Sequence, residues 1–241
     1  MTDTKAQGRV FVALDTTETG TAVELAARLR LDVGGIKVGK EFFTAQGPQG
    51  VAAVTDASDL PLFLDLKFHD IPNTVAGAVR ASLPLNPFMV NVHAQGGAAM
   101  MRAAADAAAA AGADRPLVIA VTVLTSMNAD ELAATGVAGE VEAQVVRLAK
   151  MAQDSGLDGV VCSAREIAAI RNACGPDFKL VTPGIRPAWA AAGDQKRIVT
   201  PKDAIEMGAD YLVIGRPITG ADDPVAAARK IAAEIAGEPA S

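Results

Sequence analysis

The stretch LFLDLKFHDIPNT, residues 62–74, begins like a buried β-strand but carries several ionisable side chains close together. An ionised group is costly to remove from water unless it is paired, so a strand that serves only the core should avoid such residues. Successive strand residues point to opposite faces, which places Asp65 and Lys67 on one face and the apolar residues at 64, 66 and 68 on the other. The pattern predicts a strand with an apolar outer face and a charged inner face, and His69 and Asp70 follow where this strand ends.

Apolar runs of strand length recur eight times along the chain, at residues 9–15, 34–39, 62–68, 88–94, 117–125, 159–163, 179–185 and 211–216. Stretches with helical spacing lie between them, for example at 21–31, 98–112 and 140–156. Apolar strands that alternate with helices imply a parallel sheet covered by helices, and eight such units in 241 residues are typical of a single-domain α/β protein with a (β/α)8 TIM barrel. A doubly wound open sheet is the structural alternative, although the first strand lacks the GxGxxG turn of its dinucleotide-binding form. We expect a flexible N-terminal segment at 1–8, a barrel catalytic domain at 9–236 and a C-terminal tail at 237–241.

The composition excludes several classes of protein. The formal net charge is −6 and no run of lysine and arginine is present, which argues against a nucleic-acid partner but not against an anionic small molecule. No apolar run reaches the roughly 18 to 20 residues that a membrane span needs, so we expect no membrane partner and a cytoplasmic location. Cys162 and Cys174 form no CxxC pair, which favours reduced thiols over a disulfide or a structural zinc site.

A second charged position lies on the neighbouring strand. Lys37 has the opposite parity to Ile36 and Val38, and adjacent strands lie about 4.8 Å apart, so Lys37 can reach Asp65. These charges could be a structural ion pair inside the barrel, or the lysines could extend toward water. Their place at the carboxyl ends of adjacent strands, where barrels of this kind build active sites, favours a functional role. For His69 and for His93, near the end of the fourth strand, a hydrogen-bonded structural role is favoured.

Further candidates lie at the ends of other strands. Asp15, after the first strand, could accept hydrogen bonds from a sugar hydroxyl or cap the next helix, and Thr125, after the fifth, could bind a ligand or simply end the strand. The seventh and eighth strands run into TPGIRP and IGRPIT, where many barrels bind phosphate. Glycine lets the backbone approach the phosphate, and arginine supplies a forked cationic donor. The phosphate candidates are Gly184, Arg186, Gly215 and Arg216, with Gln195 as a neutral donor in the long connection after the seventh strand.

The segment DLKFHDIPNT resembles the DxKxxDIPxT signature of the orotidine 5'-phosphate decarboxylase family. Other segments look like further blocks of this family in the same order, from about residue 10 to residue 220: FVALD, IKVGKEFFTAQGP, VTVLTSM, TPGIRP followed by GDQKRIVTP, and YLVIGRPIT. The resemblance is to the bacterial form. It implies a (β/α)8 homodimer that converts orotidine 5'-monophosphate to UMP and CO2, the last step of de novo UMP biosynthesis, without a metal or organic cofactor.

The resemblance also implies a role for each matching residue. The charged catalytic array would be Lys37, Asp65, Lys67 and Asp70, with Lys67 as the proton donor to C6 of the pyrimidine. Asp70 and Thr74 would project into the neighbouring subunit's site. Asp15 and Lys37 would hold the ribose hydroxyls and Thr125 the pyrimidine, while the phosphate region would comprise Arg186, Gln195, Gly215 and Arg216.

Other functions remain open at this point. A related metal-dependent sugar-phosphate decarboxylase with the same barrel would need a carboxylate where Lys37 stands, because a lysine beside Asp65 repels a cation. A non-catalytic phosphate-binding protein is a second alternative, and a barrel isomerase is a third.

Overall fold

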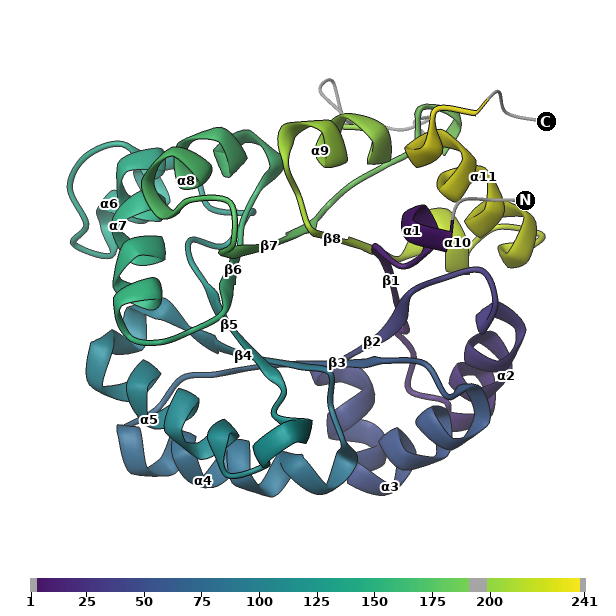
Figure 1. The fold of residues 1–241 in the computed structure, drawn as a ribbon, viewed down its shortest axis with the longest axis horizontal. Helices are drawn as coiled ribbons and strands as arrows, with labels where there is room; N and C mark the ends of the chain where they lie inside the picture. Colours follow the sequence, from purple (N-terminus) through teal and green to yellow (C-terminus); the bar gives the residue numbers. More distant parts are fainter. Residues whose placement is uncertain (1–3, 191–198, 239–241) are drawn as a thin grey trace. The chain divides into compact units, whose positions relative to one another are not determined.

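The computed structural model describes residues 4–190 and 199–238, along which strands and helices alternate (Figure 1). The eight strands follow one another from β1 to β8 in the order of a closed barrel, so the expected (β/α)8 class is confirmed. The chain divides into two compact units, Met1–Asp65 with Pro183–Ser241, and Leu66–Thr182. We refer to these as the first and the second unit and describe each by itself.

The first unit begins with α1 (Thr4–Gln7), β1 (Val10–Ala13), α2 (Thr19–Leu29), β2 (Gly35–Gly39), α3 (Lys40–Ser58) and the start of β3 (Leu62–Phe68). It resumes after β7 with η5 (Ala188–Ala190), α9 (Pro201–Met207), β8 (Tyr211–Ile214), α10 (Arg216–Thr219) and α11 (Pro224–Ala236). Strand β1 lies between β2 and β8, parallel to both, with Val12 opposite Ile36 on one side and Ile214 on the other. All four residues of β1 are buried, as expected of a strand that is covered on both faces. Helix α1 falls within the segment 1–8 that we expected to be flexible, and the domain limits stay a prediction.

The second unit holds the end of β3, α4 (Pro72–Ser82), η1 (Leu83–Leu85), β4 (Met89–His93), η2 (Ala94–Gly96), α5 (Gly97–Ala109), η3 (Gly112–Asp114) and β5 (Leu117–Val121). It continues with α6 (Ala129–Ala134), α7 (Val141–Asp154), β6 (Gly159–Val161), η4 (Ala164–Glu166), α8 (Ile167–Cys174) and β7 (Lys179–Pro183). Strands β4, β5, β6 and β7 pair in parallel and in sequence order. Most of their residues are buried and apolar, which explains why each reads as an apolar run in the sequence.

Several strands end earlier than the sequence suggested. The fifth was expected to reach residue 125, but β5 ends at Val121, so Thr125 lies in the following connection and not at the strand end. Asp15 likewise lies two positions beyond the last residue of β1. Within the connection 126–139, helix α6 begins at a capping box in which Asn128 and Glu131 each accept a hydrogen bond from the other's backbone N–H.

Two absences are clear over the residues that the structure describes. No helix there is both long enough and apolar enough to cross a bilayer. Cys162 and Cys174 are both buried, and neither forms a disulfide within the described residues.

Lys67 has an unusual backbone conformation for a strand residue. Its φ is +54°, in the left-handed region that residues other than glycine rarely adopt. The two other described non-glycine residues with positive φ, Asp59 and Asn86, end helices, where this conformation is common. A left-handed residue interrupts the regular alternation of strand side chains, so the expected placement of Lys67 on the same face as Asp65 stays a prediction.

This conformation leads to a prediction about stability. Replacing Lys67 by glycine should give a protein that is about 1 kcal/mol more stable than the alanine variant, because only alanine keeps the steric cost of positive φ. For a chain of this length, that difference is about 2–4 °C in Tm, measured by thermal unfolding of both variants.

Lys202 in α9 is the matched control, since glycine should there be less stable than alanine. If Lys67→Gly unfolds at a lower temperature than Lys67→Ala, the left-handed conformation is not the source of the strain.

Candidate active site

Lys37 on β2 lies between two carboxylates of the first unit. Its Nζ is 3.2 Å from Asp15 Oδ1 and 3.5 Å from Asp65 Oδ2, so the expected approach of Lys37 to Asp65 is present. The side chains of Lys37 and Asp65 are only 9% and 12% exposed, whereas that of Asp15 is 59% exposed. The ammonium is therefore taken out of bulk water but is compensated by charge on two sides. We call Asp15, Lys37 and Asp65 the Lys37 cluster.

The backbone around the Lys37 cluster leaves room for the lysine to bend. Gly39 pairs with Asp65 across β2 and β3, and a Cβ built on Gly39 would lie 3.0 Å from Lys37 Nζ. On the other side, a Cβ on Gly215 would lie 3.8 Å from Asp15 Oδ2. The predicted residue Gly215 thus lies close to the predicted residue Asp15, and Gly39 is a residue that sequence reasoning did not single out.

Two arginines of the first unit meet at one cavity. Arg186, after β7, and Arg216, at the start of α10, both line a cavity of about 300 Å³. Its described lining contains no carboxylate and is completed by Trp189, Ala190, Pro217, Gly220 and Ala221. A cavity with two guanidinium groups and no acidic residue suits an anion such as phosphate, which arginine can bind through paired N–H donors.

The connection after β7 is fixed at its base. The backbone N–H of Arg186 donates to the carbonyl of Val199 over 3.3 Å. Trp189 faces Lys230 of α11, whose Nζ lies 5.9 Å from the centre of the indole ring. Gln195, predicted to bind in the phosphate region, lies outside the described residues.

In the second unit, Lys67 is held by a buried side chain. The backbone N–H of Lys67 donates to Asn91 Oδ1 over 2.7 Å, and Asn91 on β4 is fully buried. Sequence reasoning missed Asn91, since one asparagine in the apolar run FMVNVHA carries no motif of its own. The only available signal was a polar residue in an otherwise apolar strand.

The remaining predicted residues of the second unit lie on its surface. Asp70 is exposed, and its Oδ1 accepts a hydrogen bond from the N–H of Ile71 over 2.6 Å. Thr74 is exposed in the first turn of α4, and Thr125 is exposed in the connection after β5. Ile71 is 66% exposed despite being apolar. The structure describes these residues and Lys67 in a different unit from the Lys37 cluster, so their union in one site stays a proposal.

The two histidines contact each other. The rings of His69 and His93 lie 5.4 Å apart, centre to centre, and are tilted by 34°. This packing is compatible with the structural role that we favoured, although it does not test it. In the described parts of the chain, no group of three or more histidine, cysteine or acidic side chains is arranged to hold a metal ion.

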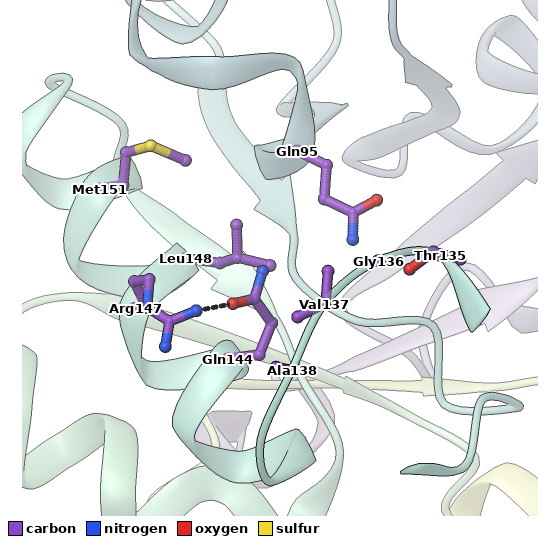
Figure 2. A pocket seen from close by; sticks show the side chains of 9 residues that line it. All are labelled: Gln95, Thr135, Gly136, Val137, Ala138, Gln144, Arg147, Leu148 and Met151. Atoms are coloured by element: carbon purple, nitrogen blue, oxygen red, sulfur yellow. Dashed lines mark hydrogen bonds between the residues drawn. The ribbon is translucent and has the colours of Figure 1, made fainter. Parts of the chain in front are cut away.

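A larger pocket lies elsewhere in the second unit and contains none of the predicted residues. It measures about 550 Å³ and is lined by Gln95, by residues 135–138 and by one side of α7. Figure 2 shows Gln144 and Arg147 of α7 joined by a hydrogen bond, with Gln95 pointing toward the same space. Cavity volume alone therefore identifies neither the Lys37 cluster nor the arginine cavity.

Comparisons with known proteins agree with the signature in residues 65–74. Residues 8–231 match the family model described as Orotidine 5'-phosphate decarboxylase / HUMPS family. A Rhodospirillum rubrum protein named orotidine 5'-phosphate decarboxylase is 63% identical over 235 residues, covering 96% of this chain and 95% of that protein. A relative of the same name from Moorella thermoacetica is 55% identical, covering 95% of this chain and 93% of its own.

Solved structures show the same likeness at lower identity. The crystal structure of orotidine 5'-phosphate decarboxylase from Lactobacillus acidophilus matches with a TM-score of 0.83 and 39% identity, covering 94% of this chain and 98% of that one. The family match spans both described units and includes the positions of the Lys37 cluster, Lys67 and the two arginines. This chain belongs to the orotidine 5'-phosphate decarboxylase / HUMPS family.

Proposed function

We propose that this chain decarboxylates orotidine 5'-monophosphate to UMP and CO2, with Lys67 as the proton donor to C6. The observation that carries the proposal is the Lys37 cluster, a buried ammonium held between two carboxylates in a member of this family. Such a cluster offers fixed charges and hydrogen-bonding groups around Lys37, the central residue of β2. Asp15 and Lys37 would bind the ribose hydroxyls of the substrate, since Asp15 is exposed enough to reach it.

The chemistry requires a group that acts as both a cation and an acid. When the bond between C6 and the carboxylate breaks, its electron pair stays on C6, and the product needs a proton there. The ammonium of Lys67 would stabilise the developing negative charge and then transfer its proton to C6. Asp65 precedes Lys67 by two residues and Asp70 follows it by three, so carboxylates flank the proposed donor along the chain.

The arginine cavity supports a role in phosphate binding. Arg186 and Arg216 converge on it without an acidic neighbour in its described lining, which favours an anion carrying two negative charges. Gly215, directly before Arg216, would let the phosphate approach the backbone, and Gln195 would add a neutral donor. Binding energy gained at the phosphate can be used to position the reacting ring at a distance from it.

We further propose a homodimer in which Asp70 and Thr74 act in the neighbouring subunit's site. Both side chains are exposed, and they flank the exposed apolar side chain of Ile71. A partner subunit would cover Ile71 and give Asp70 and Thr74 a substrate to contact. Thr125, exposed after β5, would contact the pyrimidine ring from its own subunit.

A metal-dependent sugar-phosphate decarboxylase is less favoured as the activity. The space between Asp15 and Asp65, where a divalent ion would find its ligands, is taken by the Lys37 ammonium. We propose that the reaction needs no metal or organic cofactor, that residues 9–236 form the catalytic domain, and that the protein works in the cytoplasm.

The role of Lys67 can be tested with the purified protein. With chelator present, the wild type should consume orotidine 5'-monophosphate, followed by its loss of absorbance. Lys67→Ala should lower kcat by at least about 100-fold because the acid is missing, yet still bind UMP in a calorimetric titration. Lys202→Ala, on the exposed surface of α9, is the control and should keep full activity. Undiminished UMP formation by Lys67→Ala would end the assignment of Lys67 as proton donor.

The arginine cavity gives a second prediction. Arg216→Ala should lower kcat/KM by roughly 10- to 100-fold, the usual effect of losing a hydrogen bond to a charged group. Added inorganic phosphate should inhibit the variant less than the wild type, as measured by steady-state kinetics. The exposed Arg102 of α5 serves as control, because Arg102→Ala removes the same charge elsewhere. An unchanged kcat/KM would remove Arg216 from the phosphate site.

The shared site can be tested by mixing two inactive variants. Asp70→Ala and Lys67→Ala subunits, allowed to exchange, should recover part of the activity, because a heterodimer would contain one site with both residues intact. Subunit exchange is verified by mass difference under native conditions. If activity does not return although heterodimers form, both residues serve the site of their own chain.

A further inference from the structure

The hydrogen bond between Lys67 and Asn91 joins the proposed proton donor to a residue that no motif includes. Asn91 is fully buried in β4, while the apolar residues Met89, Val90 and Val92 of the same strand are also fully buried. A buried amide is costly unless its polar atoms are hydrogen-bonded, so an apolar residue would be the simpler choice at position 91. The hydrogen bond that Asn91 Oδ1 accepts from the Lys67 N–H offsets part of the cost of burying the amide.

The conformation of Lys67 explains what the bond does. In a parallel sheet, strand N–H groups normally donate to carbonyls of the neighbouring strand, with φ near −120°. At φ of +54° the backbone of Lys67 departs from that geometry, and the side-chain oxygen of Asn91, 2.7 Å away, accepts its N–H. A strained backbone persists only where surrounding groups hold it in place, and Asn91 is such a group.

We infer that Asn91 is a positioning residue for Lys67: its side-chain oxygen holds the Lys67 backbone in the left-handed conformation and thereby directs the ammonium toward the reacting carbon. The inference rests on the proposed role of Lys67 in decarboxylation. Asn91 itself does not need to touch the substrate, since it acts through the backbone of Lys67. A shift of the donor by about 1 Å is enough to lower the rate of a proton transfer by about 100-fold.

The test uses two substitutions in the full-length protein. Asn91→Leu keeps the approximate volume and removes the acceptor, whereas Asn91→Asp keeps an oxygen that can accept the Lys67 N–H. We expect Asn91→Leu to lower kcat by roughly 10- to 100-fold with an unchanged Kd for UMP, and Asn91→Asp to recover most of that loss. Gln144→Leu is the matched control, because it removes another buried amide, which bonds Arg147 on α7 and should leave kcat unchanged (Figure 2).

Other outcomes overturn the inference. A folded Asn91→Leu protein with normal kcat would show that the bond does not position the donor. If kcat, UMP affinity and Tm fall together and Asn91→Asp is no better than Asn91→Leu, Asn91 serves only the fold. Turnover retained by Lys67→Ala would instead reject the proposed role of Lys67 as proton donor. Failure of the inference about Asn91 can thus be distinguished from failure of the proposed function.

A measurement on the wild type covers the case in which Asn91→Leu does not fold. The amide proton of Lys67 should exchange with solvent slowly, at a rate similar to that of buried strand amides, in hydrogen-exchange NMR. Exchange as fast as that of the exposed amides in the connection after β5 would mean that the bond to Asn91 is absent in solution, and would reject the inference.

Discussion

The attraction between the Lys37 ammonium and two carboxylates is the interaction on which the first unit's site depends. Neither the lysine nor Asp65 could stay so deeply buried alone, because an unpaired charge in a protein interior is strongly destabilising. Together they place two opposite fixed charges in the middle of β2 and β3, although the strands are otherwise largely apolar. Asp15, which bonds Lys37 and has a largely exposed side chain, connects this buried pair to solvent.

Much of the fold follows from the sequence because strand and helix periods are local properties. The eight apolar runs all contain a strand, and the parity of Lys37 against its apolar neighbours correctly predicted the approach to Asp65. Arg186 and Arg216 also line one cavity, as their places after the last two strands suggested, while their role in phosphate binding stays a prediction. These successes share a cause: each depends on alternation within a strand or on the order of neighbouring strands.

The features that could not be read from the sequence depend on conformation at single residues. Nothing in the letters LDLKF indicates that Lys67 takes a positive φ, because lysine has no preference for that region. The partner that supports it, Asn91, comes from another strand 24 residues along the chain. The early end of β5 left Thr125 in a connection, since apolar residues such as Val123 continue to be buried after the strand hydrogen bonds stop.

The two cavities differ both in volume and in the charge of the side chains that line them. The larger cavity beside α7 has one cation, already bonded to a neighbouring amide, whereas the smaller arginine cavity holds two guanidinium groups. For an anionic ligand, the smaller cavity is the better chemical match. The grouping and compensation of charges is therefore a better guide to a candidate site than cavity volume.

Gly39 shows that a residue without a side chain can belong to a charged cluster by leaving space for it. A single methyl group at this position would come within 3.0 Å of the Lys37 nitrogen, so even alanine would compete with the ammonium for space. The constraint on this position comes from the space that a neighbouring side chain occupies and not from the backbone angles of Gly39. In relatives with a larger residue at this position, we therefore expect the lysine side chain to be arranged differently. The residue at position 39 would then indicate how the Lys37 cluster is built.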